Sequence, residues 1–429
     1  MQRGCRVKLC RHRAPENEID LNSKLYQPIL SNHPIIIFTT KRGAYKKIGL
    51  IKNDWYFSYP PSFGRLIFRM MPRKGFNLIG YATSPLGLGE DLRSFASILE
   101  FLKIPFSILD LPTDSSGKVP YGWQYLTTED YDNSIFFMSP MGCQQLFKSF
   151  PELFTKPKNT IGYFLWELPD LPDEFIPSLK LVTHIWCPTK FVQKSFMAKS
   201  RQLTLCLPLP VIQAQAIGFD FRDRLAIPEN AFVALYMFDM HSTINRKNPQ
   251  AAVTAFLEFS KNIKDAYLVL KINRWENRDQ KELSWLPQHP QIKLVTETLM
   301  PGHLVDLYRA ANCYLSLHRS EGFGRTLVEA LQNNLALIST NYSGPADFIN
   351  EQNAYLVQWQ ARKLLAGEYP HSKGSTWSEP SIRDAVSHLH TLYQHGFHEK
   401  SVQALLTGKS FETSALAKRY EPIIRSYLI

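Results

Sequence analysis

Residues 313–330 read CYLSLHRSEGFGRTLVEA and join a short apolar run to an amphipathic stretch through a loop with two glycines. The run over 313–317 predicts a buried strand, and the stretch over 325–332 predicts a helix. In a parallel α/β sheet such a loop lies at the carboxyl ends of the strands, where open sheets bind their ligands. We therefore expect a ligand site here.

The same alternation of apolar runs and helix-like stretches extends from residue 76 onward, which is typical of parallel α/β sheets. The other expected strands are 76–81, 106–110, 134–138, 160–165, 184–188, 231–238, 267–272 and 335–339. The other expected helices are 91–103, 249–260, 304–311 and 414–428. Pro208 and Pro210 exclude both a helix and a central strand at that point, so we expect a linker between two lobes there.

Composition excludes several classes of protein. A hydrophobic content of 44% excludes intrinsic disorder, and no apolar run reaches the roughly 18–20 residues of a membrane span. The six cysteines form no CxxC pair, which favours reduced thiols, and the first twenty residues resemble no signal peptide. We expect a cytoplasmic protein, with peripheral attachment to the inner face of the cytoplasmic membrane as a further hypothesis.

The positive charge is concentrated at one end of the chain. The net charge is +11, and residues 1–75 hold 15 Lys and Arg against 4 Asp and Glu, which leaves 34 of each sign in residues 76–429. A basic extension can approach an anionic membrane or a nucleic acid, or it can simply pack on the first lobe with its arginines solvated. The neutral body and the absence of a recognised motif weigh against nucleic acid.

Two carboxylates in the opening stretch have a spacing that suits an extended ligand. Glu321 precedes the expected helix and Glu329 lies about two turns into it, ~12 Å further along at ~1.5 Å per residue. Gly322 and Gly324 allow backbone N–H groups to approach an anion at the helix start. A nucleoside diphosphate-sugar fits this span. The alternative is that Glu329 lies on a solvated helix face and Gly324 is an ordinary turn.

A basic pair follows the expected strand over 231–238. Arg246 and Lys247 precede Asn248 and Pro249, which predict a helix cap and a first helical position. Arginine binds phosphate through a planar fork and lysine binds it as a point charge, so the pair can hold a pyrophosphate. An exposed pair in a loop is the alternative. The presence of an acidic strand-to-helix junction and a basic one in the same lobe favours a binding site over an exposed pair.

These segments resemble glycosyltransferase family 4, the glycosyl transferases group 1. Glu321 and Glu329 match its Glu-x7-Glu motif, and Arg246 and Lys247 match the basic pair of its Arg-Lys-Asn-Pro segment. The resemblance covers about residues 76–360. Further similar segments are 87–90, 161–169, 185–189, 341–347 and 353–357. Arg325 departs from the pattern, because many members have an apolar residue there.

The resemblance implies an α/β protein with the GT-B fold, in which two Rossmann-like lobes face a central cleft. Four regions follow, which are a basic extension over 1–75, an acceptor lobe over 76–208, a nucleotide-sugar lobe over 209–405 and a C-terminal helix over 406–429 that returns to the first lobe. It further implies retaining transfer of a hexosyl group to a glycan or lipid-linked acceptor, in bacterial surface polysaccharide synthesis.

The resemblance also implies roles for individual residues. The expected catalytic residues are Arg246, Lys247 and Glu321. The expected donor-binding residues are Gly322, Phe323, Gly324, Thr326, Leu327 and Glu329. In the first lobe we expect Gly87, Gly89 and Glu167 in an acceptor or phosphate loop, although Glu167 fits a surface loop equally well. Trp166 and Trp186 are expected in the core. No cofactor or metal is expected, because no Asp-x-Asp dyad suited to a magnesium diphosphate is seen.

Two rival functions stay open at this stage. One is a GT-B protein that binds sugar nucleotides without transferring the sugar, or a related epimerase. The other is a nucleic-acid-binding protein that uses residues 1–75, which predicts salt-sensitive binding that is lost when the segment is deleted. Four intact charged residues, Arg246, Lys247, Glu321 and Glu329, count against a degenerate sugar-nucleotide binder.

Overall fold

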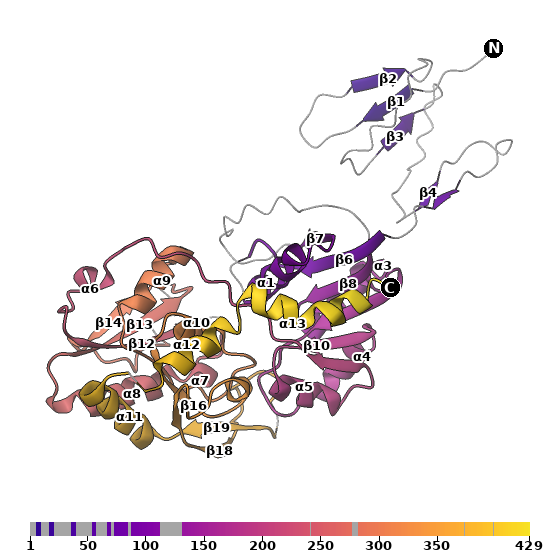
Figure 1. Cartoon of the computed structure of the whole chain (residues 1–429). Helices are drawn as coiled ribbons and strands as arrows, with labels where there is room; N and C mark the ends of the chain where they lie inside the picture. Colours follow the sequence, from indigo (N-terminus) through magenta and orange to yellow (C-terminus); the bar gives the residue numbers. More distant parts are fainter. Residues whose placement is uncertain are drawn as a thin grey trace, which may run out of the picture.

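Figure 1 shows the fold as a computed structural model of the 429-residue chain. From residue 73 onward the structure describes the whole chain except 85–86, 112–130, 241, 277–281, 373 and 398. Before residue 73 it describes five strands, β1 (Arg6–Leu9), β2 (Asn17–Asp20), β3 (Ile36–Thr39), β4 (Asp54–Tyr56) and β5 (Ile67–Arg69). β1 pairs with β2 and β3, and β4 pairs with β5, all antiparallel. The remainder of the basic segment, to which the membrane and nucleic-acid hypotheses refer, lies outside the described residues.

The first lobe is built on a sheet with the strand order β11-β10-β9-β8-β6-β7, and its described strand pairs are all parallel. Its strands are β6 (Arg73–Gly80), β7 (Phe106–Asp110), β8 (Tyr131–Phe137), β9 (Asn159–Tyr163), β10 (His184–Cys187) and β11 (Leu203–Cys206). Its helices are α1 (Gly87–Phe101), α2 (Pro140–Ser149), α3 (Glu152–Thr155), α4 (Ile176–Leu179) and α5 (Lys190–Met197), with a 3-10 turn η1 (Asp173–Phe175).

The second lobe repeats this plan with the strand order β14-β13-β12-β15-β16-β17, again parallel in its described pairs. Its strands are β12 (Phe232–Asp239), β13 (Ala266–Asn273), β14 (Ile292–Val295), β15 (Cys313–Ser316), β16 (Ala336–Thr340) and β17 (Tyr355–Val357). Its helices are α6 (Phe221–Arg224), α7 (Ile244–Lys247), α8 (Pro249–Phe259), α9 (Pro301–Arg309), α10 (Arg325–Gln332) and α11 (Ile382–His395), with 3-10 turns η2 (Ser260–Asn262) and η4 (Gly344–Asp347).

The second lobe contains elements that the sequence did not predict, among them β14, β17 and α11. An antiparallel hairpin of β18 (Trp359–Lys363) and β19 (Thr376–Pro380) stands between β17 and α11. The expected helix over 304–311 instead begins at Pro301, because proline suits a first helical position. The predicted strand over 313–317 and helix over 325–332 are confirmed, as is the break at the two linker prolines.

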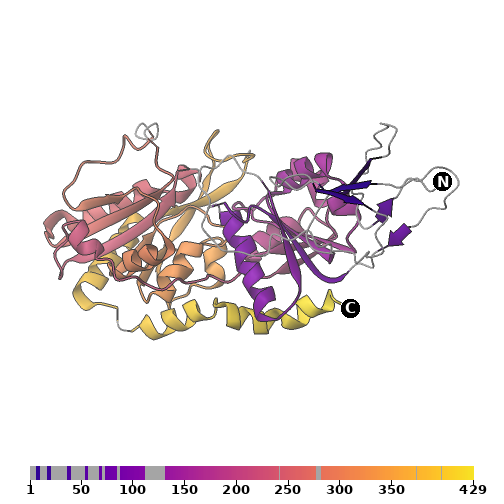
Figure 2. The ribbon, with the colours of Figure 1, turned by 90° about the horizontal axis from the view of Figure 1, so that it is seen from above.

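The chain returns to the first lobe after the second is complete. Helices α12 (Ser401–Lys409) and α13 (Thr413–Ser426) run along both lobes, as Figure 2 shows in yellow. α13 packs on α1, and its Tyr420 and Ile424 belong to the same apolar cluster as Phe76 and Phe95. The core of the first lobe therefore includes side chains from the other end of the sequence.

The carboxyl ends of the two sheets face each other. The hydroxyl of Thr189, just after β10, donates to the carbonyl of Gly322, just after β15, at 2.8 Å. The N–H of Lys190 donates to the Asp347 carboxylate at 2.5 Å. In addition, Phe323 lies in the apolar cluster of the first lobe. The loops after the strands of one lobe thus meet those of the other. None of the helices in the described part of the chain is both long and apolar enough to cross a membrane.

Candidate functional site

Hydrogen bonds to backbone carbonyls join the basic junction around Arg246 and Lys247 to the acidic junction around Glu321. Asn248 adopts a left-handed conformation between α7 and α8, and its side-chain amide donates to the carbonyl of Leu317 at 2.9 Å. The N–H of Arg319 donates to the carbonyl of Arg246 at 2.8 Å. Since α7 follows β12 and the acidic loop follows the neighbouring β15, these bonds place the basic pair beside residues 318–324.

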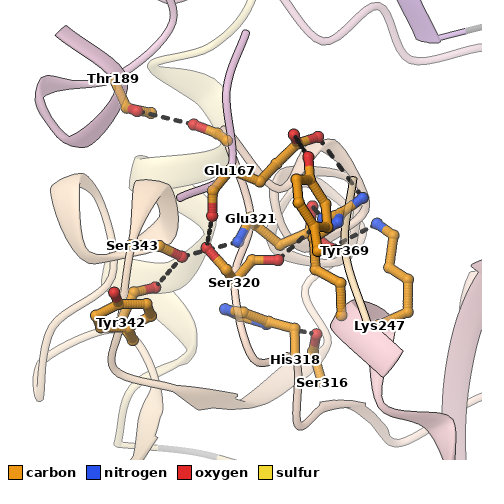
Figure 3. A network of polar contacts seen from close by, with 12 residues as sticks. Glu167, Thr189, Lys247, Ser316, His318, Ser320, Glu321, Tyr342, Ser343 and Tyr369 are labelled. Atoms are coloured by element: carbon orange, nitrogen blue, oxygen red, sulfur yellow. Dashed lines mark hydrogen bonds and ion pairs between the residues drawn. The ribbon is translucent and has the colours of Figure 1, made fainter. Parts of the chain in front are cut away.

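Glu321 is the centre of the resulting cluster of charges (Figure 3). Its carboxylate accepts from Arg246 Nη1 at 3.0 Å and from Lys247 Nζ at 2.5 Å. Burial alone would raise the pKa of Glu321, but the two cations outweigh it and lower that pKa to about 2. Burial likewise opposes the charge of Arg246, while Glu321 and Glu167 raise its pKa. Glu321 and Arg246 are therefore both charged near neutral pH.

Close packing fixes the loop that carries Glu321. Its N–H donates to Ser343 Oγ at 2.8 Å, and its carbonyl accepts from the N–H of Gly344 at 2.9 Å. A Cβ at Gly344 would stand 2.2 Å from the carbonyl oxygen of Gly322, so only glycine fits there. His318 is fully buried below the loop, its Nδ1 lies 3.0 Å from a serine hydroxyl, and burial lowers its pKa to about 4.

Glu167 brings a carboxylate from the first lobe into this cluster. Its Oε1 lies 3.7 Å from Arg246 Nη2, and its Oε2 accepts a hydrogen bond from the hydroxyl of Tyr369. Its carbonyl accepts from the hydroxyl of Ser320, next to Glu321 (Figure 3). Glu167 is thus placed between the lobes rather than on an outer loop. Trp166 and Trp186 are buried, as predicted.

Glu329 has different surroundings, two turns into α10. The hydroxyl of Tyr308 donates to its carboxylate at 2.7 Å, and burial raises its pKa, although Tyr308 and Arg325 oppose that rise. The helix begins after Gly324, whose φ of +92° favours glycine. The two motif glutamates therefore share one loop and helix while only Glu321 has cations in direct contact.

The other predicted donor residues form the walls of this segment. Phe323 is buried against Phe348 and Phe411, with ring centroids 5.7 and 5.6 Å away. Leu327 lies in the apolar core of the second lobe. Their side chains therefore pack inside the protein, and a donor would meet their backbone. The carbonyl of Thr326 accepts from a tyrosine hydroxyl at 3.2 Å.

The predicted glycines of the first lobe lie at the start of α1. A Cβ at Gly89 would stand 2.4 Å from the carbonyl oxygen of Tyr81, so the helix start requires glycine, whereas Gly87 has open space around it. No hydrogen bond or ion pair among the described residues joins either glycine to the cluster around Glu321. Their predicted role at a phosphate stays a prediction.

Arg325, the departure from the family pattern, joins the two lobes. Its guanidinium donates to Asp91 of α1 at 2.8 Å and to the carbonyl of Pro210 in the linker at 3.3 Å. Sequence reasoning missed this contact, and it also missed Tyr369 and His318. Arg325 and His318 both lie in the segment 313–330, which was the available signal for them, whereas Tyr369 lies far from any recognised motif.

Comparison with known proteins connects this geometry with a family. Residues 219–366 match the family model described as glycosyl transferases group 1. These residues belong to that family. The glycosyltransferase group 1 region contains the basic pair and both motif glutamates. No curated protein sequence matches the chain. In the described residues, His, Cys, Asp and Glu form no group of three that could hold a metal ion.

Solved structures show that the two lobes have the GT-B fold. HepE of Anabaena, in complex with UDP and glucose, is 11% identical with a TM-score of 0.58 over 82% of this chain and 100% of its own. Sucrose-phosphate synthase from Thermosynechococcus elongatus is 12% identical with a TM-score of 0.61 over 82% and 99%. Pneumococcal O-GlcNAc transferase GtfA, in complex with UDP and GlcNAc, is 16% identical with a TM-score of 0.50, and the chain covers 57% of its length against 69% of its own. At these identities the likeness extends to the fold alone.

Proposed function

We propose that the protein is a retaining glycosyltransferase that moves a hexosyl group from a nucleoside diphosphate-sugar to a glycan or lipid-linked acceptor. The convergence of Arg246 and Lys247 on Glu321 is the observation that carries this proposal. It lies at the carboxyl ends of two neighbouring strands, inside the glycosyltransferase group 1 region and opposite the first lobe.

The two cations suit the leaving group of such a reaction. When the bond between the anomeric carbon and the diphosphate breaks, negative charge grows on the departing phosphate oxygen. Arg246 and Lys247 stabilise that charge from fixed positions, which is usually the largest contribution to catalysis of this kind. Because side chains supply the positive charge, we propose that transfer needs no added metal, which EDTA treatment tests.

The two motif glutamates suit the two polyhydroxylated parts of the donor. Glu321 remains a carboxylate in the working pH range and can accept hydrogen bonds from the hexose hydroxyls. We assign Glu329, further along α10, to the ribose hydroxyls, from which its carboxylate would accept hydrogen bonds. The acceptor oxygen then bonds to the anomeric carbon on the face that the diphosphate leaves, and its proton passes to the departing phosphate oxygen. Attack on this face retains the configuration.

The acceptor side of the site belongs to the first lobe. Glu167 is the carboxylate that this lobe brings beside Arg246, and we propose that it contacts the acceptor hydroxyl. A role in bacterial surface polysaccharide synthesis, at the inner face of the cytoplasmic membrane, completes the proposal. The structural neighbours include a lipopolysaccharide outer core galactosyltransferase, WaaB, which is 14% identical with a TM-score of 0.54 over 82% of this chain and 99% of that one.

A two-step experiment tests the proposal. A thermal-shift panel of UDP, GDP, ADP and CMP identifies the base, and UDP comes first because two of the neighbours were solved with it. Radiolabelled transfer from the matching nucleotide-sugar to membrane lipid extracts and glycans follows. Stabilisation with no transfer to any acceptor would favour a sugar-nucleotide binder or an epimerase. No stabilisation by any nucleotide would contradict the donor site.

A further inference from the structure

The hairpin of β18 and β19 reaches from the second lobe to the first. Besides the bond from Tyr369 to Glu167, its loop pairs His371 with Glu174 and brings Ser375 Oγ to 3.4 Å from an aspartate carboxylate. The Tyr369 ring also stands edge-on to Trp166, with centroids 5.5 Å apart. The loop of the hairpin therefore connects the two lobes.

The base of the hairpin is firmly attached beside the acidic loop. Trp377 is almost fully buried, with Arg319 and Arg362 lying 5.7 and 5.1 Å from its ring centroid. Both arginines also pair with Glu379, at 2.8 and 2.9 Å. Because Arg319 is two residues before Glu321, the position of the hairpin is coupled to that of the charged cluster.

Arg246 keeps one edge of its guanidinium without a hydrogen bond. Nη1 is used twice, by the carbonyl of Ser320 at 2.9 Å and by Glu321 at 3.0 Å. Nε is buried and has no hydrogen-bond partner among the described residues. Among the described residues Nη2 forms no hydrogen bond, and Glu167 Oε1 lies 3.7 Å from it, which is beyond hydrogen-bond range. Nε and Nη2 together form the side-on edge that binds two phosphate oxygens at once.

Glu167 lies beside Nη2 of that edge, at 3.7 Å, and does not form a hydrogen bond with it. A carboxylate so close to a buried guanidinium would normally close to about 2.8 Å and form a strong pair. The hydroxyl of Tyr369 donates to its other oxygen. Burial, with the charge of Glu167, raises the pKa of Tyr369, so the hydroxyl keeps its proton.

We propose that Tyr369 is a positioning residue that holds Glu167 off Arg246 and so keeps the Nε–Nη2 edge available for the donor diphosphate. This inference rests on the proposed function and adds a residue to its site from the hairpin. Without the hydroxyl, Glu167 pairs with Arg246 and competes with phosphate. A hydroxyl that merely fastens the hairpin would have no such link to the charge of Glu167.

A positioning role for Tyr369 and a purely structural role in fastening the hairpin predict different affinities for the double variant of Tyr369 and Glu167. The probe is UDP, or whichever diphosphate the thermal-shift panel selects, and its dissociation constant is measured by calorimetry. Tyr369→Phe keeps the ring and is expected to weaken binding about fivefold, the value of one lost hydrogen bond. Glu167→Gln removes the competing charge and should tighten binding. The double variant Tyr369→Phe with Glu167→Gln should bind as tightly as Glu167→Gln alone.

His371→Ala is the matched control, because it removes another contact of the same loop and leaves Glu167 alone. Its dissociation constant should stay within about twofold of the wild type. Equal weakening by His371→Ala, or a double variant as weak as Tyr369→Phe, would overturn the positioning role while the wild type still binds. A wild-type protein that binds no nucleotide would instead refute the proposed function, and this inference with it.

Discussion

Glu321 and Glu329 occupy two regions of one loop and helix, and their surroundings are opposite. Glu321 meets two cations, and its pKa falls to about 2 in spite of burial. Glu329 meets a tyrosine hydroxyl, and burial raises its pKa. Of the two glutamates in this motif, Glu321 thus stays charged and Glu329 is more readily protonated. Environment, rather than residue type, decides what each can bind.

The largest expected difference between the two glutamates is in stability. Glu321→Ala leaves Arg246 and Lys247 close together without their shared carboxylate, and should lower the free energy of unfolding by about 3 kcal/mol. Glu329→Ala loses one hydrogen bond and should cost about 1 kcal/mol. Urea denaturation of both variants measures this. Equal losses would show that the cations are compensated by other groups.

The next largest effect is expected on the affinity for a nucleoside diphosphate, which should differ between variants beside Glu321 and variants of Glu329. Lys247→Ala removes a charge-assisted contact and should weaken nucleoside diphosphate binding by about 10- to 100-fold, with folding intact. Glu329→Ala removes a ribose contact and should weaken it by about tenfold. Lys199→Ala, which removes a cation paired with Asp173 in the first lobe, serves as the control. Unchanged calorimetric affinity in both site variants would contradict the donor-site assignment.

A smaller effect tests the environment of Glu329 directly. Tyr308→Phe removes the hydroxyl that donates to its carboxylate and keeps the buried ring. Stability should fall by about 1 kcal/mol, and substituting Glu329→Gln as well should recover part of it, because a neutral amide needs the donor less than a carboxylate does. Thermal or urea unfolding of the wild type, the two single variants and the double variant gives the coupling free energy between the two side chains. Strict additivity would show that the hydroxyl and the carboxylate act independently.

The pH dependence of stability should have opposite sign in the two regions. The lowered pKa of Glu321 stabilises the fold above about 4.5, and this contribution is lost as pH falls toward about 2. The raised pKa of Glu329 destabilises the fold at pH values above 4.5, the ordinary pKa of a glutamate. This penalty disappears at lower pH. Between pH 7 and 4.5, the difference in free energy of unfolding between the wild type and Glu329→Gln should therefore narrow. Over the same range, the difference between the wild type and Glu321→Gln should stay constant.

The repeating α/β pattern made most of the fold predictable. Long apolar runs such as 231–238 and the Asn248–Pro249 signal correspond to β12 and the start of α8. Short or polar strands carried too little pattern, so β11, β14 and the β18–β19 hairpin were missed. In those segments, pairing with neighbours in the folded protein determines the strand.

The candidate site was predictable where strand-to-helix junctions of the second lobe supplied its residues. Strand-to-helix loops indicated Arg246, Lys247 and Glu321 because the position of such loops in a parallel sheet is known in advance. Contacts between distant segments had no such signal. Tyr369 reaches Glu167 across 202 positions of sequence, and Arg325 reaches Asp91 across 234. Only the arrangement of both lobes brings these pairs together.

The return of α13 to the first lobe has a consequence for how the protein is made. The first lobe leaves the ribosome long before Tyr420 and Ile424, which its apolar cluster requires, have been synthesised. The carbonyl of Tyr427 also accepts from the buried side chain of Asn133 at 3.0 Å. Domains usually fold in the order of their synthesis. Here the lobe that is translated first can complete its core only after the lobe that is translated second has emerged.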